Sequence, residues 1–311
     1  MPNIICIAGP TASGKTALAV ELAKELNGEV ISCDSMQIYR RMNIGTAKPT
    51  KEEMQGIPHH MIDVADPDED FSVSRYCEMA TPILDDILTR GKNAIIAGGT
   101  GLYMDSLIRG NDFAPYPATG ARERLEKEAD EKGMDVMLTK LQSIDPEAAE
   151  KLHLADRKRI LRALEVYEET GETITAHNKR TQAIPPRYRA LWLGLDFEPR
   201  QALYDRIDLR VSLMLEQGLV DEIKNLLASG IPAKCTAMQA IGYKEFVAAL
   251  NGNGPVEAAA DEVRKASRHY AKRQLTWFRR NPEMHWLVRH EGENFEEILL
   301  QARHLARQFD K

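Results

Sequence analysis

The sequence predicts an α/β protein whose parallel sheet is interrupted by an all-helical insertion. Apolar runs at 3–8, 29–33 and 93–99 stop at glycine or aspartate, which is typical of buried parallel strands. An amphipathic pattern over 16–27 predicts a helix between the first two runs. Strands that alternate with helices favour a doubly wound parallel sheet, and ligands of such sheets bind beyond the carboxyl ends of the strands.

The insertion is predicted from a change of pattern in the middle of the chain. The segment 110–121 is rich in Gly, Pro and small polar residues, which marks a boundary. From about 121 to 180 the pattern is helical, and its best helix covers 156–171. Prolines at 184–189 close this part, and the apolar run 190–197 indicates a return to the sheet. The resulting division gives a catalytic core of residues 1–111 and 191–311 and a helical insertion of residues 112–190.

The same patterns give the boundaries of the other elements. Gly28 is the expected C-cap of the first helix, because glycine adopts the left-handed conformation that ends many helices. After the insertion, long helical patterns dominate up to a final apolar run. The elements expected there are helices at 199–217, 219–229, 236–250 and 256–279 and a strand at 284–288.

Composition and charge narrow the class of protein. The 311 residues have the composition of an ordinary globular protein, with a formal net charge of −6 that gives no overall indication of a nucleic-acid partner. No apolar run reaches the length of a membrane span, and the N-terminus lacks the layout of a signal peptide. The four cysteines are scattered without metal-type spacing, which favours a reducing compartment. We therefore expect a cytoplasmic protein, and a monomer by default.

A phosphate-binding loop follows the first predicted strand. Its sequence, GPTASGKT, matches G-x-x-x-x-G-K-[ST] and lies between a strand and a helix, as a P-loop NTPase-like core requires. The glycines let successive backbone N–H groups point inward, the lysine adds a point charge, and the threonine hydroxyl can ligate Mg²⁺. The pattern predicts a Mg²⁺-dependent polyphosphate site without naming the ligand. Its residues are Gly9, Pro10, Thr11, Ala12, Ser13, Gly14, Lys15 and Thr16.

Asp34 lies at the end of the second predicted strand, beside the phosphate loop. Three roles are open for its carboxylate: it can ligate Mg²⁺, cap a following helix, or act as a base. A kinase-like P-loop enzyme is expected to carry an acidic Mg²⁺ ligand on another strand. The candidate strand here, 93–99, ends in glycine before Thr100. The residues by themselves therefore leave the role of Asp34 undecided.

Nearly the whole chain resembles the tRNA dimethylallyltransferases, which prenylate the adenine immediately 3′ of the anticodon. The resemblance includes long and unusual motifs such as ISCDSMQIYRRMNIGTAKP (31–49) and PHHMIDVADPDEDFSVSRY (58–76). Eukaryotic relatives carry a C-terminal zinc finger, which is not found before residue 311, so the bacterial form is expected. The other motifs that carry the resemblance are GPTASGKT, GGTGLY (98–103), DRKRILRALEVYEETG (156–171), AIGYKEF (240–246) and YAKRQLTWFRR (270–280).

This resemblance implies a reaction in which no phosphoryl group moves. The loop holds the diphosphate of dimethylallyl diphosphate, the exocyclic amine of adenine attacks the allylic carbon, and diphosphate leaves. Position in the family motifs makes Asp34 the general base and places Thr100 near the reacting amine. Lys15 and Arg210 contact the diphosphate, and Mg²⁺ is expected on Thr16. The implied acceptors are tRNAs that read codons beginning with U.

Basic clusters suit the RNA partner that the resemblance implies. Residues 264–280 contain seven Lys or Arg and no acid, interleaved with aromatic side chains, which favours contacts to phosphates and unstacked bases. By the resemblance, the insertion grips the anticodon stem. The tRNA-binding residues implied are Asp34, Ser35, Met36, Gln37, Thr100, Arg122, Lys158, Arg159, Ile160, Leu161, Arg162, Gln239, Gly242, Tyr243, Lys244, Arg273, Gln274, Trp277, Arg279 and Arg280.

Three other functions compete with this one. A P-loop kinase for a small metabolite would use the same loop for ATP. A transferase that prenylates free adenine nucleotides would have little use for a basic aromatic helix or a helical insertion. A non-catalytic RNA-binding module would need neither an intact phosphate loop nor Asp34 at the neighbouring strand end.

Overall fold

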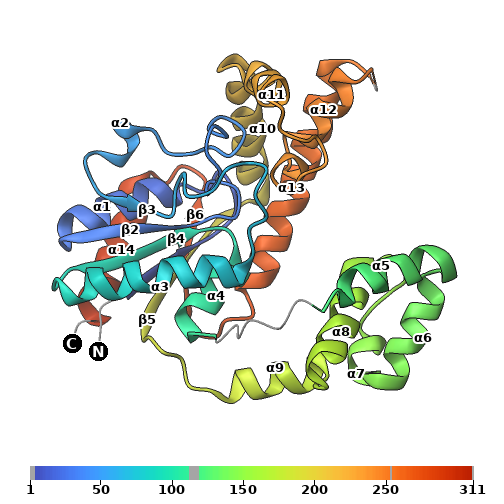
Figure 1. The fold of residues 1–311 in the computed structure, drawn as a ribbon. Coiled ribbons are helices and arrows are strands. Elements are labelled where there is room, and N and C mark those ends of the chain that lie inside the picture. Colours follow the sequence, from blue (N-terminus) through green and yellow to red (C-terminus); the bar gives the residue numbers. More distant parts are fainter. Residues whose placement is uncertain (1–3, 112–118, 253, 310–311) are drawn as a thin grey trace. The chain divides into compact units, whose positions relative to one another are not determined.

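The computed structural model describes residues 4–111, 119–252 and 254–309. A six-stranded, fully parallel sheet forms the centre of the larger part of the chain, in the order β3-β2-β4-β1-β5-β6 (Figure 1). This confirms the predicted α/β fold and its P-loop NTPase-like sheet. The strands are β1 (Ile4–Ala8), β2 (Gly28–Cys33), β3 (His59–His60), β4 (Asn93–Gly98), β5 (Ala190–Glu198) and β6 (Met284–His290).

Alternation along the central strands directs side chains to both faces of the sheet. Ile5 of β1 pairs in register with Ile95 of β4 and Leu191 of β5, and all three belong to one buried cluster. That cluster also contains apolar side chains of α1 (Lys15–Glu25) and α14 (Phe295–Phe309), which therefore cover this face. Every residue of β1 is buried, as its position in the middle of the sheet requires.

Other helices of the core position the site at the carboxyl ends of the strands. The helices α3 (Val73–Thr89) and α4 (Gly101–Arg109) pack on β2 and β4, and α10 (Arg200–Glu216) packs on β5 and on α13 (Val256–Phe278). A second buried cluster joins α10 and α13 to the segment after β2. The shorter helices are α2 (Lys51–Met54), α11 (Leu219–Ala228), α12 (Lys244–Leu250) and the 3-10 turn Ala237–Gln239.

Three local expectations were wrong or incomplete. Helix α1 ends at Glu25, and Asn27 rather than Gly28 takes a left-handed backbone, with φ 49°. Gly28 instead begins β2, because asparagine also tolerates that conformation. The helix expected at 236–250 is divided by Gly242, whose φ is 96°. The edge strand β3 was not predicted, because two histidines give no apolar run.

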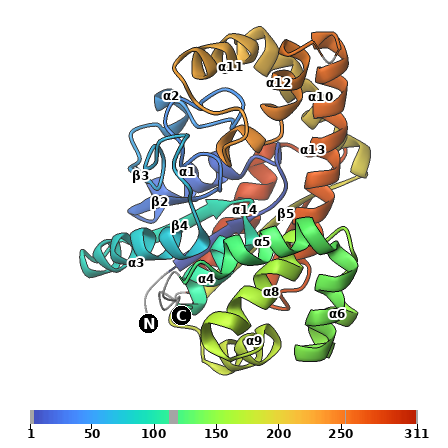
Figure 2. The same ribbon diagram turned by 45° about the vertical axis from the view of Figure 1, so that its right-hand side comes forward.

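The described helices of the insertion form a compact unit with their own core. Tertiary contacts divide the chain into Met1–Gly110 with Arg187–Lys311, and Asn111–Pro186. The expected boundary segment 110–121 falls largely outside the described residues, and the second structural boundary precedes the expected one by a few residues. Within the unit, α5, α6 and α8 pack against one another (Figure 2). Its helices are α5 (Ala121–Lys132), α6 (Met134–Ile144), α7 (Pro146–Glu150), α8 (Arg157–Thr170) and α9 (Ile174–Ala183).

Among the described residues, no helix combines the length and the hydrophobicity that a membrane span requires.

Candidate active site

The phosphate loop connects β1 to α1 and is held in its curled shape by side chains of α10. Ala12 has φ 63° and Gly14 has φ 95°, so the backbone passes twice through the left-handed region. For Ala12 this conformation is unfavourable, and its carbonyl oxygen accepts a 2.9 Å hydrogen bond from Nε of Arg206. Arg210, one turn later, donates from Nη1 to the Thr11 hydroxyl at 3.3 Å. Two arginines of one helix therefore fix the loop.

Lys15 and Arg210 make the space above the loop strongly favourable for an anion. Burial, and then the charge of Arg210, lower the pKa of Lys15 to about 7, although Asp34 opposes this shift. Burial and Arg206 likewise lower the pKa of Arg210. The Lys15 ammonium donates to the Pro10 carbonyl at 2.7 Å. An anion that binds here would pair with both desolvated cations and offset the repulsion between them.

Ser13 adds an unused polar group to the same loop. Its side-chain oxygen is buried and has no hydrogen-bond partner within the described part of the chain. A buried hydroxyl without a partner costs free energy, and a phosphate oxygen would remove that cost. The Ser13 hydroxyl is therefore available to a phosphate ligand, because no atom of the described protein binds it.

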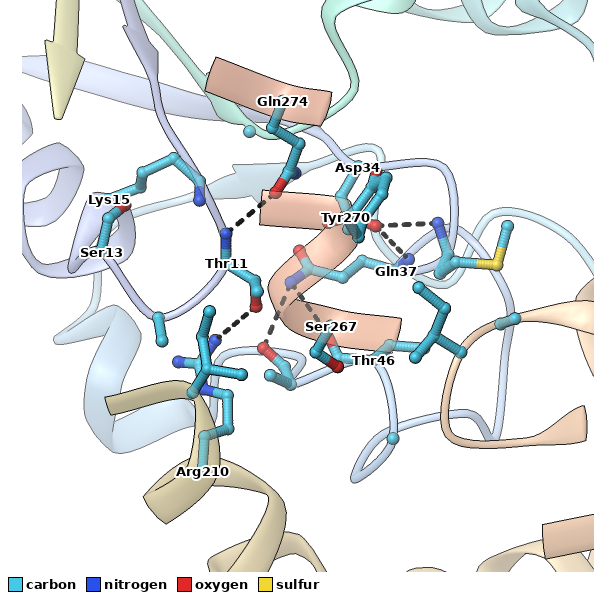
Figure 3. A pocket seen from close by; sticks show the side chains of 18 of the residues that line it. Thr11, Ser13, Lys15, Asp34, Gln37, Thr46, Arg210, Ser267, Tyr270 and Gln274 are labelled. Atoms are coloured by element: carbon cyan, nitrogen blue, oxygen red, sulfur yellow. Dashed lines mark hydrogen bonds between the residues drawn. The ribbon is translucent and has the colours of Figure 1, made fainter. Parts of the chain in front are cut away.

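Asp34 follows β2 and lines the same cavity as the phosphate loop (Figure 3). Its Oδ1 accepts hydrogen bonds from the backbone N–H groups of Met36 and Gln37, at 2.8 and 3.3 Å. The carboxylate therefore caps a turn, not a helix, because residues 35–38 form turns. Since a carboxylate has two oxygens, capping by Oδ1 is compatible with a second role for Oδ2.

Thr100 joins the end of β2 to the turn between β4 and α4. Its hydroxyl accepts a 3.0 Å hydrogen bond from the Ser35 N–H and donates to the Ser35 hydroxyl at 3.3 Å. Thr100 occupies the N-cap position of α4, but its side chain makes no capping bond there. The hydroxyl is instead directed to the residue next to Asp34.

A single cavity of about 540 Å³ brings the phosphate loop, Arg210 and Asp34 together, whereas Thr100 is not among the residues that line it. Such a volume is typical of small-ligand sites. Its walls come from the phosphate loop, the end of β2, α10, the segment around 239–244 and the middle of α13. The predicted site residues that line it are Thr11, Ala12, Ser13, Gly14, Lys15, Thr16, Asp34, Ser35, Met36, Gln37, Arg210, Gln239, Lys244, Arg273 and Gln274.

Several predicted RNA contacts have other partners in the structure. The Gln37 amide donates to the carbonyls of Thr46 and Ala47 and accepts from the Ser32 hydroxyl, so its polar atoms are engaged within the protein. Tyr243 is fully buried and donates to Glu222. A side-chain contact from Tyr243 to RNA is therefore corrected, because the ring fills the core of the second cluster.

At the end of α13, some of the predicted RNA contacts are engaged within the protein and others are exposed. Gln274 lines the cavity but is only 5% exposed and bonds to the protein backbone on both sides, so its assignment as an RNA contact stays a prediction. Trp277 donates from Nε1 to Asp105 at 2.8 Å, and Arg279 pairs with Asp196 at 2.9 Å. Arg280 is exposed and stacks over the Trp277 ring. Of these side chains, Arg280 is the one most open to a partner.

In the insertion, the predicted RNA contacts at 158–162 lie on two different faces of α8, one exposed and one buried. Lys158, Arg159 and Arg162 are exposed, whereas Ile160 and Leu161 are fully buried in the helical core. The side chains of Ile160 and Leu161 are therefore not open to RNA, since helix periodicity turns them to the core while their neighbours face outward. On α5, Arg122 forms an ion pair with Glu126.

Glu222 of α11 is a positioning residue that the sequence did not reveal. Its carboxylate accepts hydrogen bonds from the backbone N–H groups of Asn43, Ile44 and Gly45, and from the Tyr243 hydroxyl. It thereby holds the segment whose carbonyls bind Gln37, next to the cavity. No pattern indicates this bond, because its partners lie 177 to 179 positions apart along the chain.

Comparison with known proteins agrees with this geometry. The pattern of the family described as IPP transferase matches residues 37–281, and that of isopentenyl transferase matches residues 2–69. The tRNA dimethylallyltransferase of Acetivibrio thermocellus is 47% identical over 300 residues, which cover 96% of each chain. That of Thermoanaerobacter pseudethanolicus is 48% identical over 298 residues, which cover 95% of each chain.

Solved structures show the same relationship. The tRNA isopentenylpyrophosphate transferase of Bacillus halodurans has a TM-score of 0.74 and 42% identity, over 99% of this chain and 98% of that one. A eukaryotic dimethylallyltransferase acting on tRNA has a TM-score of 0.82 and 30% identity, over 97% of this chain and 78% of that one. By sequence and by structure, the chain belongs to the IPP transferase family of tRNA dimethylallyltransferases.

Proposed function

We propose that the cavity transfers a dimethylallyl group from dimethylallyl diphosphate to the exocyclic amine of the adenine next to the anticodon of tRNA. One observation carries this proposal: a single cavity joins the anion-binding loop after β1 to a carboxylate at the end of β2, with β4 lying between these two strands in the sheet. The loop suits the diphosphate that leaves, and the carboxylate suits the proton that the amine must lose. Family membership supplies the two substrates, and we infer that the acceptors are tRNAs for codons that begin with U.

The proposed step breaks the bond between the allylic carbon and the diphosphate oxygen and forms a bond from that carbon to nitrogen. The electron pair of the broken bond goes to the diphosphate, where Lys15, Arg210 and the inward N–H groups of the loop stabilise the growing charge. The amine proton goes to Asp34, through the oxygen that does not cap the turn. Thr100 fixes the backbone beside Asp34 through Ser35.

Mg²⁺ fits the donors of the cavity as an ion shared with the substrate. Among the residues that the structure describes, no cluster of three His, Cys, Asp or Glu could hold a metal ion by itself. The Thr16 hydroxyl lines the cavity, and a site with few protein oxygen donors suits Mg²⁺ that is bound together with phosphates and water. When bound there, Mg²⁺ would neutralise charge on the leaving diphosphate.

One assay tests this function against its rivals. Purified protein, Mg²⁺ and labelled dimethylallyl diphosphate are combined with tRNA or with AMP as the acceptor. We expect label in tRNA, an equal amount of released diphosphate, and no reaction with AMP. Label in AMP would make the protein a nucleotide prenyltransferase. Production of ADP from ATP without either acceptor would indicate a kinase.

Binding of the diphosphate substrate is expected to take up a proton. In the free protein Lys15 has a pKa of about 7, and an adjacent diphosphate raises that value again. Affinity for dimethylallyl diphosphate should therefore increase as the pH falls from about 9 to about 7, by up to about tenfold per unit, and level off below. Calorimetry in buffers of different ionisation enthalpy measures the proton uptake. The same uptake by Lys15→Met would show that another group titrates.

We further propose that the exposed basic side of α13 contacts tRNA phosphates. Lys272 and Arg273 are exposed on this helix, and Arg273 also lines the cavity and stacks over Tyr270. Lys272→Ala should weaken tRNA binding and lower the slope of log affinity against log salt by about one. Lys224→Ala, which removes a lysine of α11 paired with Asp221, is the matched control. A salt slope equal to that of the control would place Lys272 away from phosphates.

The helical insertion is proposed to bind the anticodon stem. Lys158, Arg159 and Arg162 lie on the exposed side of α8 and offer three cations to a phosphate backbone. Their neighbours Ile160 and Leu161 anchor the helix in the core of the unit. The basic side is therefore presented by a helix that its own apolar contacts hold in place.

A further inference from the structure

We propose that Gln274 is a positioning residue that sets the distance between the diphosphate-binding loop and the carboxylate that receives the proton. This inference rests on the proposed transferase function and concerns the geometry of the same cavity. Gln274 lies on α13 and is only 5% exposed, so its amide needs partners inside the protein. Both of its polar ends have one.

The amide of Gln274 connects two loops that are distant in sequence. Its Oε1 accepts a 3.0 Å hydrogen bond from the backbone N–H of Thr11, in the phosphate loop (Figure 3). Its Nε2 donates a 3.0 Å hydrogen bond to the backbone carbonyl of Gly99, in the turn between β4 and α4. One side chain therefore joins the part of the site that binds the leaving group to a turn beside the base.

From Gly99 the connection continues to the catalytic carboxylate. Gly99 precedes Thr100, whose hydroxyl accepts the Ser35 N–H, and Ser35 is the neighbour of Asp34. Two hydrogen bonds of Gln274 and one of Thr100 thus join the phosphate loop to Asp34. Displacement at carbon requires the leaving oxygen and the attacking nitrogen to be in line, and an error of about 1 Å costs about 10²-fold in rate.

Glycine at position 99 allows the Gln274 amide to approach the backbone closely. A Cβ atom at Gly99 would lie 2.0 Å from Nε2 of Gln274, so no larger residue fits while the amide keeps its place. One turn along α13, Trp277 packs against Gly101 in the same way, with a built Cβ 2.2 Å from its ring. One side of α13 therefore lies against both Gly99 and Gly101, and Gln274 extends this contact to the phosphate loop.

Two variants separate positioning from general packing. Gln274→Met keeps the length of the side chain but removes both hydrogen bonds. Gly99→Ala displaces the amide without changing α13. In single-turnover reactions with both substrates saturating, each should be about 10- to 100-fold slower than the unmodified protein. The dissociation constant for tRNA should change little. The melting temperature of the Gln274→Met protein should fall somewhat, because the Thr11 N–H and the Gly99 carbonyl lose their partner, but the protein should remain folded at the assay temperature. Leu275→Met, at a buried neighbour on the same helix, is the packing control and should retain nearly the full rate.

A double-variant cycle gives the decisive comparison. If Gly99 acts by leaving room for Gln274, the rate losses of Gly99→Ala and Gln274→Ala should be strongly non-additive. The double variant should then be no slower than the slower single variant. Rate losses that multiply, or a Gln274→Met protein with the unmodified rate, would overturn the proposal. The unmodified protein is assayed in parallel: if it fails to prenylate tRNA, the proposed function fails, whereas failure confined to the variants concerns Gln274 alone.

Discussion

Replacing Asp34 with asparagine is expected to slow the transfer step by about 10²- to 10⁴-fold while the affinity for tRNA changes little. Asparagine keeps an oxygen that can accept the backbone N–H groups of Met36 and Gln37, so the turn should persist. What it loses is the charge and basicity that take up the amine proton. The measurement is the single-turnover rate at saturating substrates beside the dissociation constant for tRNA.

Asp34→Ala provides the comparison, because it removes the cap as well as the base. The alanine protein should be as slow as the asparagine protein and also less stable, by about 0.5–1.5 kcal/mol for each hydrogen bond to the turn that is lost. If instead Asp34→Asn weakened tRNA binding by the same factor as the rate, the carboxylate would serve recognition and another group would accept the proton.

Lys15→Met is expected to have the next largest effect, about 10²- to 10³-fold on the transfer rate, with affinity for the diphosphate reduced as well. The lysine is desolvated beside Arg210, and its charge is directed to the place where the leaving diphosphate becomes more negative. Methionine fills a similar volume without that charge. The rate and the dissociation constant for dimethylallyl diphosphate are measured separately, so that a loss in binding can be distinguished from a loss in the transfer step.

Lys24→Met is the matched control on the same helix. Lys24 lies at the other end of α1 and pairs with Glu21 on the surface, so its removal should leave the rate unchanged. Affinity for tRNA should be normal in both proteins. A Lys15→Met protein as fast as the Lys24→Met protein would mean that the loop holds something other than the leaving group.

The parts of the site that follow local patterns could be predicted from the sequence. The strand ends before Gly9 and Asp34 were predictable because apolar runs report buried strands directly, and a parallel sheet brings their ends to one edge. The phosphate loop carries its own signature. Gln274 and Glu222, by contrast, act through backbone groups far away along the chain, and no local pattern reports such a bond.

The predicted RNA contacts show a second limit. The family resemblance implies RNA contacts throughout residues 158–162, yet helix geometry directs Ile160 and Leu161 to the core while Arg159 and Arg162 are exposed. The helical period of 3.6 residues by itself separates the buried from the exposed positions of this segment. No periodic pattern around Tyr243 indicates that its side chain is buried, because its hydrogen-bond partner Glu222 belongs to another helix.

A crystal structure with a tRNA anticodon stem-loop and an unreactive analogue of dimethylallyl diphosphate tests the central claim most directly. We expect the diphosphate in the loop of Gly9 to Thr16, in contact with Lys15 and Arg210. The exocyclic nitrogen of the target adenine should lie within hydrogen-bond distance of Asp34, opposite the leaving oxygen. A nucleoside triphosphate in that loop, with its terminal phosphorus facing a hydroxyl acceptor, would contradict the account.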